Sequence, residues 1–250
     1  MLDFLYTLII YPIEQIIELS YGLSFKTFHN DGMAILCISV LVSIVTLPLY
    51  FMAEKHQQTE RNIQKRLKPK IDKIRAVFHG DEQYMILSSY YRQNNYHPIY
   101  ALRSSIGLLI QIPFFIAAYS YLSNFAALKG YSFLFIRDLG SPDNLLSFNG
   151  FAINILPILM TIINIAGSAV YTKDFPLKEK IQLYGMAVIF LLLLYNSPSG
   201  LVLYWTANNV FSLVKNCLQK TKHSKKIVYC VVAVCVLSLD IYLLIIPRSI

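Results

Sequence analysis

Residues 181–214 form a run of 34 amino acids without a charged side chain. Lys180 and Lys215 lie immediately outside its two ends. About 18 uncharged apolar residues are already typical of a membrane-spanning helix. The cluster Ser197-Pro-Ser-Gly200 near the centre of the run is a turn signal. The run therefore predicts two consecutive spans of about 15 residues each, or about 22 Å at the helical rise.

The rest of the chain has the same apolar character. Only 14% of the residues are charged, whereas 56% are apolar, and a soluble globular protein carries about 25% charged residues. The sequence therefore predicts an all-α polytopic membrane protein. Its six expected spans are residues 33–52, 104–125, 151–172, 181–196, 200–216 and 227–246, the last of which contains Asp240.

The distribution of basic residues predicts the orientation of these spans. Eighteen of the 22 lysines and arginines fall in three clusters, within residues 53–103, 173–180 and 215–226. Positively charged loops favour the cytoplasmic side of a membrane. All three clusters lie on that side if the 34-residue run crosses the membrane twice, which again favours two spans over one kinked helix.

The connecting segments have distinct characters. Residues 1–32 carry apolar residues at near-helical spacing together with Asp3, Glu14 and Glu18. This favours an amphipathic helix on the outer face over a seventh span. Residues 126–150 form the expected outer loop, and residues 217–226 a basic cytoplasmic linker before the last span.

Residues 53–100 predict a cytoplasmic helical hairpin. Ile63, Leu67, Ile71, Ile74 and Phe78 form one apolar stripe. His79-Gly80 ends this arm, and a second helix follows with Tyr84, Leu87 and Tyr91 on one face. Two interpretations of the basic face stay open, namely an arm near anionic lipid headgroups and a docking arm for the ribosome, the translocon or substrate. The candidate docking residues are Arg61, Lys65, Arg66, Lys68, Lys70 and Lys73.

Residues that carry enzymatic chemistry are missing from the expected spans. All five histidines lie outside them, and no acidic cluster or nucleotide-binding loop of the Gly-x-x-x-x-Gly-Lys type is present. The four cysteines show no Cys-x-x-Cys spacing and read as single buried thiols. The sequence therefore predicts a protein that is not an enzyme, with no catalytic residues, no metal site and no cofactor.

Uncharged polar residues occur in several spans. Within one span such residues more often mediate helix packing than line a channel. Taken together across spans, they could instead line a wet cavity. The set comprises Ser39, Ser43, Thr46, Gln111, Ser120, Asn164, Ser168, Thr206, Asn208 and Asn209.

Seven short motifs resemble those of the YidC/Oxa/Alb membrane-protein insertases, in the order of that family. They cover residues 11–219 and are Tyr11-Pro-Ile13, Leu47-Pro-Leu49, Leu67-Lys-Pro-Lys-Ile71, Leu109-Ile-Gln-Ile-Pro-Phe114, Arg137-Asp-Leu139, Ile155-Leu-Pro-Ile-Leu-Met160 and Pro198-Ser-Gly-Leu-Val-Leu-Tyr204. Each motif alone is weak, but their common order makes the resemblance specific.

The resemblance implies a five-span core with a hydrophilic groove that is open to the cytoplasm and to lipid. It implies a multi-pass protein of the bacterial cytoplasmic membrane that inserts and helps fold nascent membrane proteins, alone or beside the Sec translocon and the ribosome. No nucleic-acid recognition is expected beyond ribosome contact. Substrate contact in the first and fifth of these spans, as the resemblance implies, points to Thr46, Tyr204 and Trp205. The polar positions Ser43, Gln111, Asn164 and Thr206 complete the candidate groove residues.

Two departures from the family pattern leave a second function open. Ser43 stands where the family groove commonly holds an arginine, and residues 227–246 form an extra span. Both features fit a scaffold or a dedicated chaperone for one membrane complex, with reduced general insertase activity. A channel or transporter is disfavoured, because the chain has neither coupled charges at mid-membrane nor two similar halves.

Overall fold

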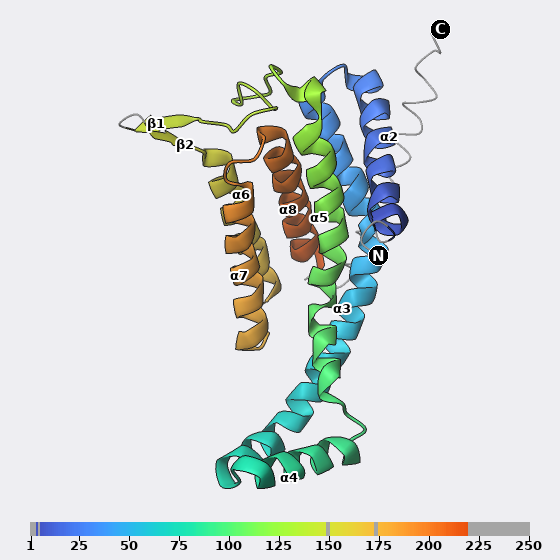
Figure 1. Ribbon diagram of the computed structural model, residues 1–250, viewed down its shortest axis with the longest axis vertical. Helices are drawn as coiled ribbons and strands as arrows, with labels where there is room; N and C mark the ends of the chain where they lie inside the picture. The colour runs from blue at the N-terminus through green and yellow to red at the C-terminus, as the bar shows by residue number, and fades with distance from the viewer. Residues whose placement is uncertain (1–3, 5, 149–150, 173–174, 220–250) are drawn as a thin grey trace. The chain divides into compact units, whose positions relative to one another are not determined.

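The computed structural model describes residues 4, 6–148, 151–172 and 175–219, and most of this part is helical (Figure 1). The chain forms two compact units, one comprising Met1–Val45 with Ala117–Ile250 and the other Thr46–Ile116. The predicted sixth span, Asp240 and most of the basic linker 217–226 lie outside the described residues.

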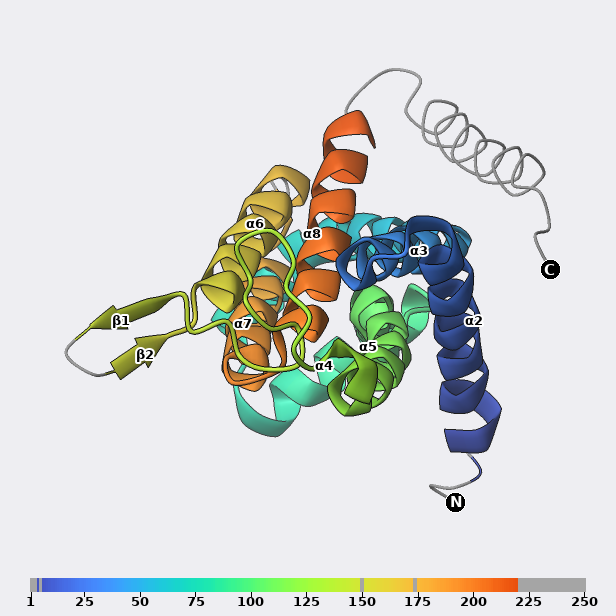
Figure 2. The same cartoon turned by 90° about the horizontal axis from the view of Figure 1, so that it is seen from above.

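The first unit contains a π-helical turn η1 (Tyr6–Ile10) and α2 (Tyr11–Phe28), followed by the beginning of α3 (Asp31–Val77). It continues with the end of α5 (Ile106–Asn124), the short η3 (Ala126–Leu128) and the strands β1 (Leu146–Phe148) and β2 (Phe151–Ile153). Three helices complete it: α6 (Ile155–Tyr171), α7 (Leu177–Leu194) and α8 (Ser199–Gln219). In Figures 1 and 2, α6 lies beside both α7 and α8.

The 34-residue uncharged run folds as two helices, α7 and α8, joined by the Ser-Pro-Ser-Gly turn. These helices have 18 and 21 residues, or about 27 and 32 Å at 1.5 Å per residue. The expected length of about 22 Å was too short. The helices continue past the uncharged run into Lys178 and Lys180 at one end and Lys215 at the other.

The second unit is the expected helical hairpin, but its first arm is not a separate helix. Helix α3 runs without interruption for 47 residues, so the predicted first span and the first arm form one element that includes Pro48 and Pro69. Helix α4 (Gly80–Gln93) is the second arm, and η2 (Pro98–Ser105) follows it. Within the described residues, α3 is the one helix that is long and apolar enough, by length and composition, to cross a membrane, and α6 is apolar but shorter.

Two local expectations were wrong. Residues 151–153, predicted to begin the third span, pair with β1 as a strand. Tyr84, predicted to share the inner face of the second arm, is 75% exposed.

In α2 the expected apolar residues divide between buried and exposed positions, because Ile17 is fully buried while its neighbour Ile16 is 42% exposed. The buried face of α2 also includes Tyr21, whose hydroxyl donates to Asp31 at the start of α3.

The beginning of α6 receives its cap from a distant part of the chain. The side chain of Asn154, at the N-cap position, makes no capping hydrogen bond to α6. Oδ2 of the buried Asp143 accepts from the backbone N–H groups of Ile155 at 2.7 Å and Leu156 at 3.1 Å. These N–H groups have no carbonyl partner within the helix, and a negative charge there is favourable.

Replacement of Asp143 by alanine should lower the free energy of unfolding by about 1–2 kcal/mol, the cost of a lost helix cap. Asp143→Asn should retain most of the stability, because its amide oxygen can still accept both bonds. Unfolding by SDS titration in mixed micelles measures the difference. The exposed Asp72 on α3 provides the control Asp72→Ala; equal losses at the two aspartates would contradict the capping role.

Candidate functional site: the amides of α8 and the cytoplasmic hairpin

The Pro198–Tyr204 motif begins with a turn that the outer loop clasps. The N–H of Gly200 donates to the carbonyl of Leu139 at 2.8 Å. Both the N–H and the hydroxyl of Ser199 donate to the carbonyl of Ser141, at 2.8 and 2.6 Å. A Cβ on Gly200 would lie 3.1 Å from the same Leu139 oxygen. Glycine at position 200 therefore suits the close backbone approach, and Ser199 contributes its hydroxyl as a second donor to the carbonyl of Ser141.

Asp138 organises the loop that makes this clasp. Its carboxylate accepts from the N–H groups of Gly130 and Gly140 and from the hydroxyl of Ser141, at 2.8–3.0 Å. These bonds, led by that from Gly140, hold the pKa of Asp138 below its usual range. The Arg137-Asp-Leu139 motif thus has a structural role, which is to shape the loop that holds the start of α8.

Below the turn, α8 carries amide side chains that reach neighbouring helices on two sides. Ser43 on α3 donates to Oδ1 of Asn208 at 2.7 Å, and Ser39 reaches the same oxygen at 3.4 Å. On the other side, Nδ2 of Asn164 on α6 donates to Oδ1 of Asn209 at 3.0 Å. We call these five residues the amide seam.

The seam continues toward the end of α8. Asn216 Nδ2 lies 3.4 Å from the carbonyl oxygen of Gly167 on α6. A Cβ on Gly167 would lie 3.7 Å from the backbone of Leu213 on α8, so the two helices approach closely here. Small residues at such crossings allow backbones to come together. The buried Nδ2 of Asn209 and Oδ1 of Asn216 make no hydrogen bond in the described structure, so both amides retain unused hydrogen-bonding capacity.

The structure brings together only some of the predicted groove residues. Ser43 and Asn164 join the seam through Asn208 and Asn209, two residues that the sequence flagged only as polar. The hydroxyl of Thr206 donates to the carbonyl of Val202 within α8. Thr46 and Gln111 belong to the other unit, where Thr46 is buried and Gln111 half-buried.

Tyr204 and Trp205 are buried in this structure. They are 1% and 3% exposed. The Trp205 ring packs against Phe190 of α7, with 4.8 Å between the ring centroids. Their burial supports a packing role, and substrate contact at these two positions stays a prediction.

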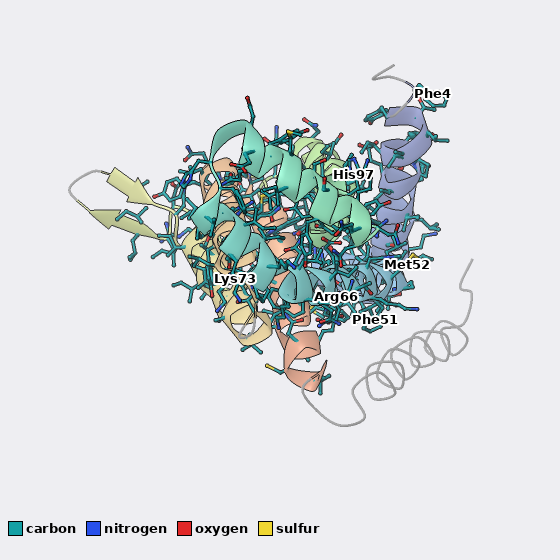
Figure 3. The ribbon with its side chains drawn as sticks, turned by 90° about the horizontal axis from the view of Figure 1, so that it is seen from below. Phe4, Phe51, Met52, Arg66, Lys73 and His97 are labelled. Atoms are coloured by element: carbon teal, nitrogen blue, oxygen red, sulfur yellow. The ribbon has the colours of Figure 1, made fainter. Side chains whose placement is uncertain are left out.

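The basic surface of the helical hairpin is mostly as expected. Figure 3 looks onto α4 and the hairpin part of α3, with Arg66 and Lys73 labelled along α3. Of the six candidate docking residues, Lys65, Arg66, Lys68, Lys70 and Lys73 are exposed. Arg61, which was predicted to belong to this surface, is only 4% exposed, and its guanidinium donates to Oε1 of Gln58. We call the five exposed residues the basic face.

A buried carboxylate that the sequence analysis missed lies beneath the basic face. Glu60 is 1% exposed. Its Oε1 accepts from the hydroxyl of Tyr96 at 2.6 Å and from Nε2 of Gln64 at 2.9 Å. Burial, followed by the bond to Glu60, raises the pKa of Tyr96. The Tyr96–Glu60 bond ties the chain after α4 back to α3 and thereby closes the hairpin.

Comparison with known proteins supports a family assignment. The family model described as the 60Kd inner membrane protein matches residues 23–226. Similar relatives are the "Membrane protein insertase YidC" of Treponema denticola, 29% identical over 82% of this chain and 36% of the relative, and that of Leptospira interrogans, 29% identical over 80% and 33%. The protein of the same name from Endomicrobium trichonymphae is 30% identical over 76% of this chain and 36% of the relative.

A solved structure is similar as well. The "Active YidC insertase crystal structure with the first transmembrane domain resolved" has a TM-score of 0.51 and 26% sequence identity. The match covers 82% of this chain and 45% of that one. The chain spans about a third of the length of the curated relatives it matches.

The hydrogen bond between Ser43 and Asn208 should show measurable coupling. A double-mutant cycle with Ser43→Ala and Asn208→Ala should give a coupling energy of about 0.5–1.5 kcal/mol, the usual range for such bonds between membrane helices. Unfolding in mixed micelles measures it. The matched cycle pairs Ser43→Ala with Val210→Ala on the exposed side of α8 and should give no coupling. Equal values for both cycles would contradict a specific bond.

The closure of the hairpin by Tyr96 can be tested separately. Tyr96→Phe should raise hydrogen exchange in residues 58–64 and 94–100, because removal of one partner leaves a buried acceptor unsatisfied, at a cost of about 1–3 kcal/mol. Tyr84→Phe on the exposed side of α4 is the matched control and should change nothing. Unchanged exchange in both variants would mean that the Tyr96–Glu60 bond does not hold the hairpin closed.

Proposed function

Because the chain belongs to the family of the 60Kd inner membrane protein, we propose that it is an insertase and chaperone for nascent membrane proteins. Its location in a membrane follows from the family and from the relatives. Its activity, substrates and partners are proposed here from the residues of this chain, read beside the relatives that are named membrane protein insertase.

The proposed topology has six spans in the bacterial cytoplasmic membrane. The N-terminal segment and the outer loop lie outside, and the hairpin and the basic linker lie in the cytoplasm. The positive-inside rule supports this arrangement, because 18 of 22 bases then lie on one side. The lengths of α7 and α8, about 27 and 32 Å, also suit one full crossing each.

The observation that carries the proposal is the amide seam. Asn208 and Asn209 lie within a 34-residue uncharged run, where polar groups are costly unless they have partners or water. Their partners come from α3 and α6, and Asn208 and Asn164 are only half-buried. We propose that the half-buried amides of the seam, Asn208 on α8 and Asn164 on α6, present hydrogen-bonding groups to the polar backbone of an entering segment.

The predicted groove residues have three different proposed roles. Ser43 and Asn164 position the amides of α8, and Thr206 lies on the same helix. Thr46 and Gln111 remain proposed groove residues of the other unit. Tyr204 and Trp205 are proposed to support α8 from behind by packing against α7, where Phe190 lies.

The basic face is proposed to contact anionic lipid headgroups, and the ribosome or the Sec translocon during insertion. Each lysine or arginine near an anionic surface contributes about 1 kcal/mol. The five exposed bases occur on one helical arm, within nine residues from Lys65 to Lys73. The tether between Glu60 and Tyr96 gives this arm a defined attachment to the chain after α4.

A dedicated chaperone for one membrane complex is the second candidate. The observation in its favour is Ser43, which replaces the cation common in the family groove. The hydroxyl of Ser43 is engaged by Asn208, and a neutral seam offers no lasting attraction to acidic substrate segments. The predicted sixth span, outside the described residues, also favours this candidate.

Depletion rescue distinguishes the two candidates. The chain is expressed in bacterial cells whose general insertase is depleted, and insertion of several test proteins is followed by protease protection. We expect restored growth and insertion of neutral substrates, with weaker insertion of acidic-tailed ones, because the seam carries no charge. An inserted, stably folded protein that rescues no substrate would contradict the general insertase and favour the dedicated chaperone.

A further inference from the structure

The short hairpin formed by β1 and β2 projects from the beginning of α6. Figures 1 and 2 both show the two strands extending sideways, away from the helices of their unit. The strands pair antiparallel, with Leu146 opposite Ile153 and Phe148 opposite Phe151. Asn149-Gly150 between them is a strong sequence signal for a tight hairpin turn.

This hairpin is apolar and has no second sheet to cover it. Residues 144–153 contain no charge, and Leu146 is 54% exposed. Among the described residues each strand pairs only with the other. An isolated two-stranded hairpin is marginal in water, and an exposed apolar segment favours contact with another surface. We therefore expect the hairpin to lie against another surface that covers its apolar residues.

The base of the hairpin is fixed at both ends. Oδ1 of the buried Asn154 accepts from the N–H of Asn144 at 3.0 Å, and its Nδ2 donates to the carbonyl of Tyr195 after α7 at 2.7 Å. Asp143 caps α6 immediately beside it. The strands consequently leave the helices at a fixed level, which is the proposed outer end of α6 and α7.

The hairpin is continuous with the surface that α6 turns to lipid in the proposed topology. Helix α6 exposes Ile158, Leu159, Ile162 and Ile165. The uncharged sequence extends from these residues back through both strands to Asn144. If the hairpin entered water, a charged side chain would be expected between it and the lipid-facing helix. The sequence has none there.

The backbone limits how deeply the hairpin can lie. The outer edges of a two-stranded sheet carry unpaired N–H and C=O groups, which are not tolerated in hydrocarbon. The headgroup region supplies water for these edges and an apolar boundary for Leu146. We propose that the two strands, residues 146–148 and 151–153, form an anchor that lies in the interface of the outer leaflet, with the lipid surface as its partner.

This inference goes beyond the proposed insertase function and requires only that α6 spans the membrane. It gives the outer end of α6 a lateral support that does not depend on substrate. The alternative partner of the hairpin is a strand of another protein, paired with one of its open edges. In vesicles that contain no such protein, this alternative predicts that the hairpin lies in water.

The test places a fluorophore at Leu146 in a full-length variant without its four native cysteines, Cys37, Cys217, Cys230 and Cys235. Leu146→Cys carries an environment-sensitive label, and the protein is reconstituted into vesicles of phosphatidylcholine and phosphatidylglycerol. Quenching is compared for lipids brominated near the headgroup and near the chain ends. Leu134→Cys on the outer loop and Ile162→Cys on α6 are the aqueous and deep references, since both positions are exposed.

The label at residue 146 should emit as in an apolar environment. It should also be quenched at least about twofold more by the shallow bromines, in agreement with a depth of about 5–10 Å. The label at residue 162 should show the reverse preference. A water-like signal at residue 146, equal to that at residue 134, would overturn the proposal and favour a protein partner. Quenching equal to that at residue 162 would overturn it as well.

Discussion

The arrangement of α3, α6 and α8 depends on amide side chains held within an apolar environment. Few other groups compete for hydrogen bonds in an apolar environment, which favours partners for Asn208, Asn209 and Asn216 on neighbouring helices. They find them in two serines of α3, in Asn164, and in the backbone of α6 at Gly167. The outer loop fixes the start of α8 through Gly200. The position of α8 then determines where the seam lies.

The cost of placing a polar group in an apolar environment also explains why a neutral residue is suited to position 43. A buried arginine at mid-membrane costs about 2.5–3.5 kcal/mol on insertion scales unless it has water or counter-groups. Ser43 is neutral, and its hydroxyl donates to the amide oxygen of Asn208. The clustered positive charge of the chain lies instead in three segments outside the uncharged runs, residues 53–103, 173–180 and 215–226. In the hairpin, the buried Glu60 is held by Tyr96 and Gln64.

Much of the fold was predictable because membrane helices have a local signal in the sequence, namely a long run of uncharged apolar residues. The uncharged runs, the Ser-Pro-Ser-Gly turn and the Ile63–Phe78 stripe identified α5 to α8 and the hairpin. Contacts between distant residues were not predictable in this way. The cap from Asp143 to α6 spans 12 residues and the bond from Ser43 to Asn208 spans 165, and neither leaves a periodic signal. The burial of Trp205 was not predictable either, because it depends on Phe190 of another helix.

The most direct measurement is photo-crosslinking from three positions of α8 to a ribosome-bound nascent membrane segment. A crosslinker at Asn208 should capture the segment, because this half-buried amide lies on the seam. A crosslinker at the buried Trp205 should capture mainly neighbouring parts of the chain, and one at the exposed Val210 should capture lipid. Capture of the nascent segment from Trp205 but not from Asn208 would contradict a substrate-facing amide seam.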